Sequence, residues 1–449
     1  MYKRIIIFSL LFSLLNLNLY SSNADLIIVK DNEIEYFIKN ILSPILTVAN
    51  VNEKSIHIYI VNNSTPNAFV FQGQNIFIHT GLITSVDSVD EIAGVLAHEL
   101  GHITAGHLSR GDAMYSKASI FVLLGLAALL LAAPMLNNNN GNAIDIIGFL
   151  TYGTNQIATT SFLSYSRAEE SQADDIGIDY ISKTNYNPNG FYIFMNKLYQ
   201  QEDKTIYTDD IYNWYSSHPL TKSRISFIQN YINNYPYKQK YNVQHNNLQQ
   251  QLSRIKAKIL SYTLSYKEIN NIYKNSNTQD ALYAKMIANY RENNYNKAIN
   301  YGNQLLKINP KDIYTQDILG DIYFYNNQNE KAIYYYKLSL GSNQEDDITT
   351  FKISKSYLIN KNYNLALKYI NISLQINQFN PAGWDLKSII LSKLNQDSLA
   401  DLAVAYKYNI LNDKKRALFF ANKALNSLPR ESKEWIDAKE LIVNINTYN

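Results

Sequence analysis

The chain has 449 residues, a hydrophobic fraction of 46% and a formal net charge of +3. At about 150 residues per domain, this length predicts roughly three structural units. The low net charge and the lack of a dense Lys/Arg stripe argue against a nucleic-acid partner. There is no Cys, which excludes disulfides, thiolate metal ligands and a Cys-linked lipid anchor, so any metal site must use His, Asp and Glu.

The N-terminus has the form of a cleaved secretory signal peptide, which we expect to cover residues 1–24. Lys3 and Arg4 precede an apolar run from Ile5 to Leu19, and residues 22–24 (Ser-Asn-Ala) put small side chains where a signal peptidase reads them. The alternative is an uncleaved membrane anchor, for which this run is short. Removing the two basic residues leaves +3 − 2 = +1 on the mature chain. We therefore expect a protein located outside the cytoplasm.

Residues 25–235 mix helix and strand patterns and are predicted to form one domain. Apolar spacing favours a helix over Ile34–Val48, and runs of β-branched and aromatic residues favour strands. The expected strands are Ile56–Val61, Ala68–Phe71 and Asn75–Thr80. A second helix is expected over Val89–Leu108, with Asp87 or Ser88 as its N-cap.

This second helix carries the strongest chemical signal, an HExxH pattern from His98 to His102. Residues i and i+4 lie on one helix face, so both imidazoles can bind one ion, and neutral imidazoles suit zinc. Glu99 can then take a proton from an activated water molecule and pass it to the leaving amine. The competing interpretation is two surface histidines that flank a salt-bridging Glu. His107 lies off the helix face of His102 and is expected to be structural.

A second apolar run, Ala118–Leu136, is long enough to be considered as a membrane span, and a weaker one follows at Ile144–Ile157. A single crossing would put His102 on one side of a membrane and the acidic residues after it on the other. Asp145 makes a returning span unfavourable. We therefore expect residues 118–157 to form helices that cover the active site and contact a membrane surface, with an integral hairpin as the alternative.

Zinc needs a third protein ligand, and the acidic segment Arg167–Asp175 offers one. It is predicted to be a helix with Glu170 and Asp174 at positions i and i+4. Glu170 could bind the metal, and Asp174 could accept a hydrogen bond from a ligand His and so fix its tautomer. Taken alone, the segment fits an exposed acidic helix face at least as well.

The C-terminal part predicts helical repeats. Residues 236–277 are polar and are expected to form a helical connector. In residues 278–445, Ala298, Ala332 and Ala366 follow one another at intervals of 34 residues, the period of tetratricopeptide repeats. Small residues suit the contact between paired helices, and aromatic residues fill the groove to the next pair. A generic helical bundle is the alternative, and the spacing from Trp384 to Leu411 is irregular.

The pattern from His98 to His102, followed about 70 residues later by Glu-x-x-x-Asp, resembles the membrane-associated gluzincin family that includes the HtpX-like and CAAX prenyl proteases. The resemblance implies a zincin-type domain in which Glu170 is the third ligand and Asp174 supports a ligand His. Asn67, Ala68 and Phe69 resemble the family's active-site edge strand, which would hold a substrate chain in extended form by β-addition.

A signal peptide, this peptidase domain and C-terminal repeats together resemble a periplasmic branch of the family that acts in outer-membrane protein quality control. In that branch a His-Pro motif approaches the zinc and blocks it. His218 and Pro219, with Arg224 nearby in support, match this motif. The resemblance implies that His218 is a reversible fourth ligand. A His-Pro turn that caps a helix is the alternative.

We therefore expect an α+β, mostly helical fold: a zincin-type domain with a small β-sheet, followed by an α-solenoid. The expected function is a zinc endopeptidase of the bacterial envelope, with one zinc ion per chain. The resemblance implies that its substrates are unfolded or misassembled outer-membrane proteins and that the repeats bind substrate or the barrel-assembly machinery. The rival is a non-enzymatic chaperone or scaffold with a structural zinc, because His218 could complete a closed set of four protein ligands.

Overall fold

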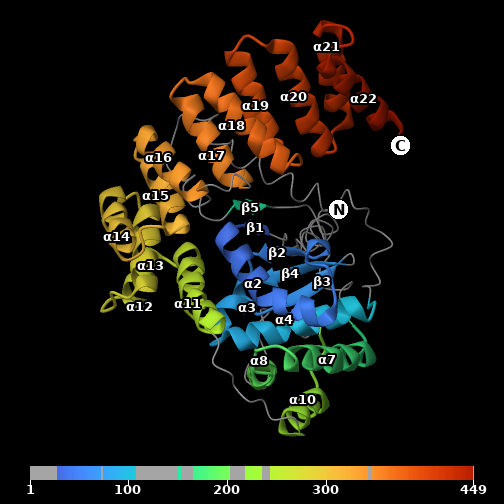
Figure 1. Ribbon diagram of the computed structural model, residues 1–449, viewed down its shortest axis with the longest axis vertical. Coiled ribbons are helices and arrows are strands. Elements are labelled where there is room, and N and C mark those ends of the chain that lie inside the picture. Colours follow the sequence, from blue (N-terminus) through green and yellow to red (C-terminus); the bar gives the residue numbers. More distant parts are fainter. Residues whose placement is uncertain are drawn as a thin grey trace, which may run out of the picture.

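The chain folds into a small β-sheet with helices on one side and an arc of paired helices on the other (Figure 1). The computed structural model describes residues 28–71, 74–107, 150–152, 165–202, 218–234, 243–341 and 346–447. The expected signal peptide at residues 1–24 lies outside these ranges, as do residues 118–149 and 153–157 of the apolar segment. Within the described part of the chain, no helix combines the length and apolar character needed to cross a membrane.

Five strands form one sheet in the order β3-β4-β2-β1-β5. Their bounds are β1 Ile28–Lys30, β2 His57–Val61, β3 Ala68–Phe71, β4 Asn75–His79 and β5 Leu150–Tyr152. β2 and β4 run parallel, and the other neighbours are antiparallel. The three strands predicted from the sequence are confirmed within a residue at each end. β5 corrects the expectation of helix at residues 150–152, since its pairing with β1 joins segments 120 residues apart that no local pattern connects.

The two faces of the sheet bury different side chains. One face packs on the helices through aliphatic residues such as Ile60, Val70 and Ile78, which belong to the main core. The other face is aromatic: Phe77 stacks on Tyr59 and Phe69 with ring centroids 4.9 and 5.1 Å apart. Ile348, near the start of helix α17, packs against this aromatic cluster. The alternation of strand side chains thus turns one face towards the helical layer and the other towards the repeats.

The helical layer of the N-terminal part consists of α2 Asn32–Ala49, α3 Thr80–Ser85, α4 Val89–Thr104, α7 Arg167–Ser182, α8 Asn189–Glu202 and α10 Lys222–Asn234. α4 begins with a capping box between Ser88 and Glu91, so Ser88, one of the two candidates, is the N-cap. The predicted helix to Leu108 ends earlier, at Thr104. Gly106 adopts φ +71°, a left-handed conformation that stops an α-helix and folds the chain back.

Glycines bring α4 and α7 into close contact. A Cβ on Gly101 would lie 2.8 Å from the Ala173 carbonyl oxygen, and one on Gly177 would lie 2.9 Å from the His98 backbone. These distances leave no room for a methyl group, because real Cβ contacts are longer. The two helices that carry the candidate metal ligands therefore touch backbone to backbone.

The expected connector, residues 236–277, forms α11 Val243–Thr263 and α12 Tyr266–Ile272. α11 contributes Leu248, Leu252, Ile255 and Ile259 to the same core as the sheet and α4. It also packs on the first repeat helix, because Ala257 shares a cluster with Ala284 and Ala288. The segment thus belongs both to the core beneath the sheet and to the core of the first repeat helices.

The repeat part consists of five helix pairs within the described residues. Their bounds are α13 Gln279–Arg291, α14 Tyr295–Ile308, α15 Ile313–Tyr325, α16 Asn329–Leu340, α17 Asp347–Ile359, α18 Tyr363–Ile376, α19 Pro381–Lys393, α20 Asp397–Ile410, α21 Lys414–Ser427 and α22 Lys433–Thr447. The expected α-solenoid is confirmed, and the three alanines at 34-residue intervals are fully buried.

The turn inside each of the first four pairs contains one residue with positive φ, and these residues repeat every 34 positions. They are Asn293 (φ 60°), Asn327 (56°), Lys361 (59°) and Asn395 (57°). The fourth pair, α19 and α20, therefore keeps the same period as the others. The regular spacing ends just after Leu411, because Asn412 (φ 56°), between α20 and α21, follows Asn395 by 17 residues instead of 34.

The repeats join the N-terminal part through buried ion pairs. Glu33, at the start of α2, accepts contacts from Lys258 (2.9 Å) and Arg254 (2.6 Å) of α11 and a hydrogen bond from the Tyr283 hydroxyl of α13 (2.7 Å). Arg254 also reaches Asp312, at the start of α15, at 2.7 Å. Three helices, α2, α11 and α13, thus meet at the Glu33 carboxylate, and Arg254 links them to the start of α15.

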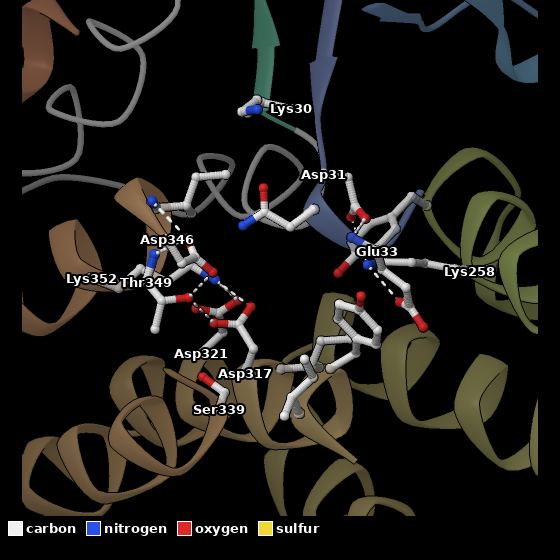
Figure 2. Close-up of a pocket in the computed structure, with 16 residues that line it drawn as sticks. Lys30, Asp31, Glu33, Lys258, Asp317, Asp321, Ser339, Asp346, Thr349 and Lys352 are labelled. Atoms are coloured by element: carbon white, nitrogen blue, oxygen red, sulfur yellow. Dashed lines mark hydrogen bonds and ion pairs between the residues drawn. The ribbon is translucent and has the colours of Figure 1, made fainter. Parts of the chain in front are cut away.

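A cavity of about 80 Å³ lies beside this junction (Figure 2). Lys258 faces Asp31 and Glu33 on one wall, and Lys352 of α17 faces Asp317 and Asp321 of α15 on the other. Each of these carboxylates has a lysine partner within 3.0 Å. The first set of ion pairs joins α11 to the start of α2, and the second joins α17 to α15 within the repeat part.

Candidate metal centre

Four buried side chains from three parts of the chain converge beneath β3. His98 and His102 lie on α4, Glu170 lies on α7 and His218 lies just before α10, and each offers one ligand atom within 4.8 Å of the others. All four are at most 1% exposed. The sequence expected three of them as metal ligands and the fourth as a reversible one, and the fold brings all four together.

The spacing of the ligand atoms fits a tetrahedral ion. The Nε2 atoms of His98 and His102 are 3.1 Å apart, and Nδ1 of His218 lies 3.5 Å from the former and 2.9 Å from the Glu170 Oε1 atom. Oε1 of Glu170 is 3.4 Å from the His102 Nε2 atom. Bonds of about 2.0–2.1 Å to a tetrahedral ion separate ligand atoms by about 3.3 Å. The donor set of imidazoles and one carboxylate is also one that zinc accepts.

The protonation of His102 and Glu170 agrees with metal binding. Burial lowers the pKa of His102 to about 3, which leaves its imidazole neutral. Burial would raise the pKa of Glu170, but His218 and the other two imidazoles hold it well below its usual value. A neutral imidazole and an ionised carboxylate are the forms that bind a cation.

Asp174 and Arg224 hold two of these groups from behind. Asp174 Oδ1 lies 3.0 Å from Nδ1 of His98, which leaves Nε2 free to face the cluster. Arg224 is 2.6 Å from both Asp174 Oδ2 and Glu170 Oε2, and it donates to the Pro219 carbonyl oxygen at 3.0 Å. Burial would raise the pKa of Asp174, but Arg224 outweighs it and the pKa is lowered. One guanidinium thus ties α7 to the segment that carries His218.

His218 uses both ring nitrogens. Nδ1 faces Glu170, while Nε2 lies 3.1 Å from the carbonyl oxygen of Ala68 on β3. The carbonyl can only accept, so Nε2 carries the proton and donates it. With the proton of a neutral His218 on Nε2, Nδ1 would present its lone pair to a metal ion held in the cluster. His218 therefore belongs to the metal cluster through one nitrogen and, through the other, donates a hydrogen bond to the backbone of the edge strand.

Glu99 is fully buried beside the cluster and is poorly satisfied. Neither carboxylate oxygen has a hydrogen bond of normal geometry within the described residues, and its Oε1 lies 3.4 Å from Nε2 of His218. Burial raises the pKa of Glu99 to about 8. A buried carboxyl group with so little to satisfy it is unfavourable for stability, which points to a use other than folding.

The expected edge strand, Asn67 to Phe69, lies over the cluster at the end of the described sheet. Asn67 accepts from the His79 amide at 2.9 Å, so Ala68 and Val70 turn their backbone groups away from β4. The Ala68 carbonyl meets His218, and the Val70 carbonyl meets the Tyr165 hydroxyl at 3.4 Å. Asn67, Ala68 and Phe69 are at most 5% exposed, so this edge is covered in the structure, with His218 and Tyr165 on its outward carbonyls.

Tyr165 and His107 belong to the site but were not predicted as part of it. The Tyr165 ring stacks on His102 with centroids 3.7 Å apart. His107 was expected to lie off the helix face of His102 and to be structural; it stays outside the cluster of four, but its Nδ1 lies 3.0 Å from Nδ1 of His102. That expectation assumed a continuous helix. Gly106 was the available signal, because a glycine after a helix predicts a reversal that returns the next residue to the last turn.

Residues 32–232 match the sequence profile of Peptidase family M48. This stretch contains α2 to α10, the sheet strands β2, β3, β4 and β5, and all four residues of the cluster. The family consists of metallopeptidases, and the cluster could hold the metal ion that such a peptidase needs.

Several curated proteins are similar to the chain. It is 25% identical over 313 residues to the beta-barrel assembly-enhancing protease of Yersinia pestis, covering 67% of this chain and 60% of that protein. The chain is 28% identical over 207 residues to the protein of the same name from Escherichia coli (strain K12), which covers 46% of this chain and 40% of that protein. The chain is 26% identical over 196 residues to the mitochondrial metalloendopeptidase OMA1 of Schizosaccharomyces pombe, which covers 44% of this chain and 52% of that protein. The chain thus spans 60% and 40% of the length of the first two relatives.

Solved structures also share similarity with the chain. MamA aligns with a TM-score of 0.28 and 12% identity over 36% of this chain and 95% of that chain. Yeast Tom70 aligns with a TM-score of 0.30 and 10% identity over 81% of this chain and 89% of that chain.

Proposed function

We propose that the chain is a zinc-dependent endopeptidase of the bacterial cell envelope, because residues 32–232 match the profile of Peptidase family M48. His98, His102 and Glu170 hold one zinc ion, and Glu99 is the catalytic base. The observation that carries this proposal is the buried, unsatisfied Glu99 carboxylate beside three convergent ligand atoms.

The bound zinc supplies Lewis-acid polarisation of the scissile carbonyl. The residues of the chain do the rest. Glu99 would take the proton of the attacking water and return it to the leaving amine. Its pKa of about 8 belongs to the metal-free site, and the positive charge of a bound zinc ion would lower that pKa and leave Glu99 ionised near neutral pH. Asp174 keeps His98 in the tautomer that presents Nε2, and Arg224 holds Glu170 in place.

Substrate binds along β3 in extended form. The outward carbonyls of Ala68 and Val70 accept the backbone N–H groups of the substrate, as in β-strand addition. Because backbone groups make these contacts, recognition depends little on substrate sequence. This low dependence on sequence suits a peptidase that removes unfolded or misassembled proteins of many kinds.

His218 is a reversible latch in this proposal. It takes the fourth position around the metal and the Ala68 carbonyl, so one side chain excludes both water and substrate. Release of His218 would free the two positions together. Arg224 holds the latch through the Pro219 carbonyl, which lies next to His218 in the chain.

The rival function is a non-enzymatic scaffold with a structural zinc, since four protein ligands close a site. The buried position of Glu99 favours the enzyme over the scaffold. A structural site has no need of a buried carboxylate next to the metal, and such a group lowers stability when nothing satisfies it.

The relatives named beta-barrel assembly-enhancing proteases support outer-membrane proteins as the substrates. We place the chain in the periplasm, delivered by a signal peptide at residues 1–24, in peripheral contact with a membrane through residues 118–157. The repeats at residues 278–445 then hold substrate or bind the barrel-assembly machinery.

The test is cleavage of a misfolded outer-membrane protein by the full chain and by Glu99→Gln. The substitution keeps the shape of the side chain and removes its basicity, so we expect a loss of cleavage of about 10²–10⁴-fold with bound zinc retained. Glu53→Gln, which removes a carboxylate from the exposed turn before β2, is the matched control and should cleave normally. If the wild type and Glu99→Gln cleave the substrate at the same rate, Glu99 is not the catalytic base, and the scaffold function would replace the proposed one.

A further inference from the structure

The end of α4 folds His107 back onto a metal ligand. The His107 amide donates to the His102 carbonyl at 2.9 Å, and the Gly106 amide donates to Ile103 at 3.2 Å. These two bonds, with Gly106 at φ +71°, form a Schellman motif. The reversal brings the His107 ring against the ring of His102, with centroids 5.1 Å apart.

Two short contacts link His102 through His107 to α7. Nδ1 of His102 lies 3.0 Å from Nδ1 of His107, and Nε2 of His107 lies 3.0 Å from the Oε1 atom of Gln172. His107 is 8% exposed, so little water competes for these contacts, while Gln172 lies on the outer side of α7.

The chemistry of the partners sets the direction of both hydrogen bonds. Gln172 Oε1 can only accept, so Nε2 of His107 donates to it. A neutral His107 then has a lone pair on Nδ1 and accepts from Nδ1–H of His102. His102 is left with its lone pair on Nε2, the atom that lies 3.1 Å from Nε2 of His98 in the cluster.

We propose that His107 is a positioning residue that, with Gln172, holds His102 in the tautomer and orientation required of a metal ligand. The proposal rests on the zinc site described above. His107 would support His102 from outside the cluster. Asp174 supports His98 in this way, Arg224 supports Glu170, and the Ala68 carbonyl supports His218. Each of the four clustered side chains then has a partner outside the cluster that fixes the atom facing the metal.

Two substitutions at His107 separate hydrogen bonding from packing. His107→Asn places a side-chain oxygen near the position of Nδ1 and can still accept from His102. His107→Leu has a similar branched shape and cannot accept. Gln172→Leu removes the outer partner and leaves His107 in place. Thermal unfolding of the metal-free full-length proteins checks that each variant is folded.

The measurement is zinc affinity by competition with a chromophoric chelator, together with the visible absorption spectrum of the Co²⁺-substituted protein. We expect His107→Leu to bind zinc about 10–100-fold more weakly, the usual effect of removing the outer partner of a ligand. His107→Asn should restore most of the affinity and the wild-type Co²⁺ spectrum, and Gln172→Leu should fall between the two.

Wild-type affinity and spectrum in folded His107→Leu would overturn the proposal. Equal impairment of folded His107→Asn and His107→Leu would also overturn it, because the acceptor would then not be the cause. Failure of the wild-type chain to bind zinc is a separate result, since it contradicts the proposed metallopeptidase itself.

Discussion

Nε2 of His218 donates to the carbonyl oxygen of Ala68 across 3.1 Å, so the segment before α10 is fixed to the edge strand that lies over the metal cluster. A substrate strand added to β3 needs this same carbonyl. In the proposed mechanism, substrate and His218 therefore compete for one backbone atom.

The first prediction follows from this competition. His218→Ala should raise the rate of cleavage of a misfolded outer-membrane protein several-fold, since it frees the Ala68 carbonyl and the fourth metal position together. The assay needs a folded variant with bound zinc, and His57→Ala, which removes an exposed imidazole from β2, is the control. Unchanged activity in folded His218→Ala would contradict the latch, and abolished activity would assign the ring a role in catalysis.

Arg224 is predicted to support both the metal and the latch. Arg224→Gln removes the charge that faces Glu170 and Asp174 and leaves these buried carboxylates uncompensated. We expect zinc affinity to fall about 10–100-fold and the thermal midpoint to drop, and chelator competition with a thermal scan measures both. Lys222→Gln, an exposed position on the same helix, should change neither property. Wild-type zinc affinity in folded Arg224→Gln would show that Glu170 needs no such support.

The close approach of α4 and α7 gives a third prediction. Gly177→Ala puts a methyl group 2.9 Å from the His98 backbone, so the helices must separate. Over-packing of this kind costs about 1–3 kcal/mol, and zinc affinity should fall as well because Glu170 moves with α7. Ser171→Ala, at an exposed position of α7, is the control. Denaturant unfolding and zinc titration test the prediction, and a Gly177→Ala variant that matches wild type in both would refute the tight packing.

The junction between the two parts of the chain predicts a dependence of stability on pH. Burial would raise the pKa of Glu33, but Lys258 and Arg254 outweigh it and lower the pKa from 4.5 to about 2. A carboxyl whose pKa is depressed on folding stabilises the folded state above its unfolded pKa, and that stability is lost as pH falls towards the folded value. A shift of this size corresponds to about 3 kcal/mol.

Glu33→Gln should therefore lower the thermal midpoint at pH 7, and the difference from wild type should shrink between pH 4.5 and pH 2. Glu53→Gln provides an exposed carboxylate for comparison. A difference between wild type and Glu33→Gln that stays constant over this range would mean that the junction does not depend on the Glu33 charge.

Local patterns in the sequence predicted much of the site. The i and i+4 spacing placed His98 with His102 and Glu170 with Asp174, and both helices formed with capping boxes at Ser88 and Ser166. The 34-residue spacing of alanines predicted the repeats. These features depend on neighbours within a few residues or on one period, which is why a single sequence reveals them.

Contacts between distant segments were not predictable in this way. β5 pairs with β1 across about 120 residues, and Glu33 meets Tyr283 across 250. The position of His107 was missed for a different reason, since a helix pattern continued past Gly106 gives the wrong direction for the next side chain. The chain reversal at that glycine, and hence the contact with His102, depends on one left-handed residue.

The central claim is that His98, His102 and Glu170 bind one divalent metal ion in the folded chain. Metal analysis of the purified full-length protein tests it most directly, in parallel with Glu170→Ala and the control His57→Ala. We predict one zinc ion per chain in wild type and in His57→Ala, and its loss from folded Glu170→Ala. A folded wild-type chain without a stoichiometric metal, or full zinc in Glu170→Ala, would contradict the account.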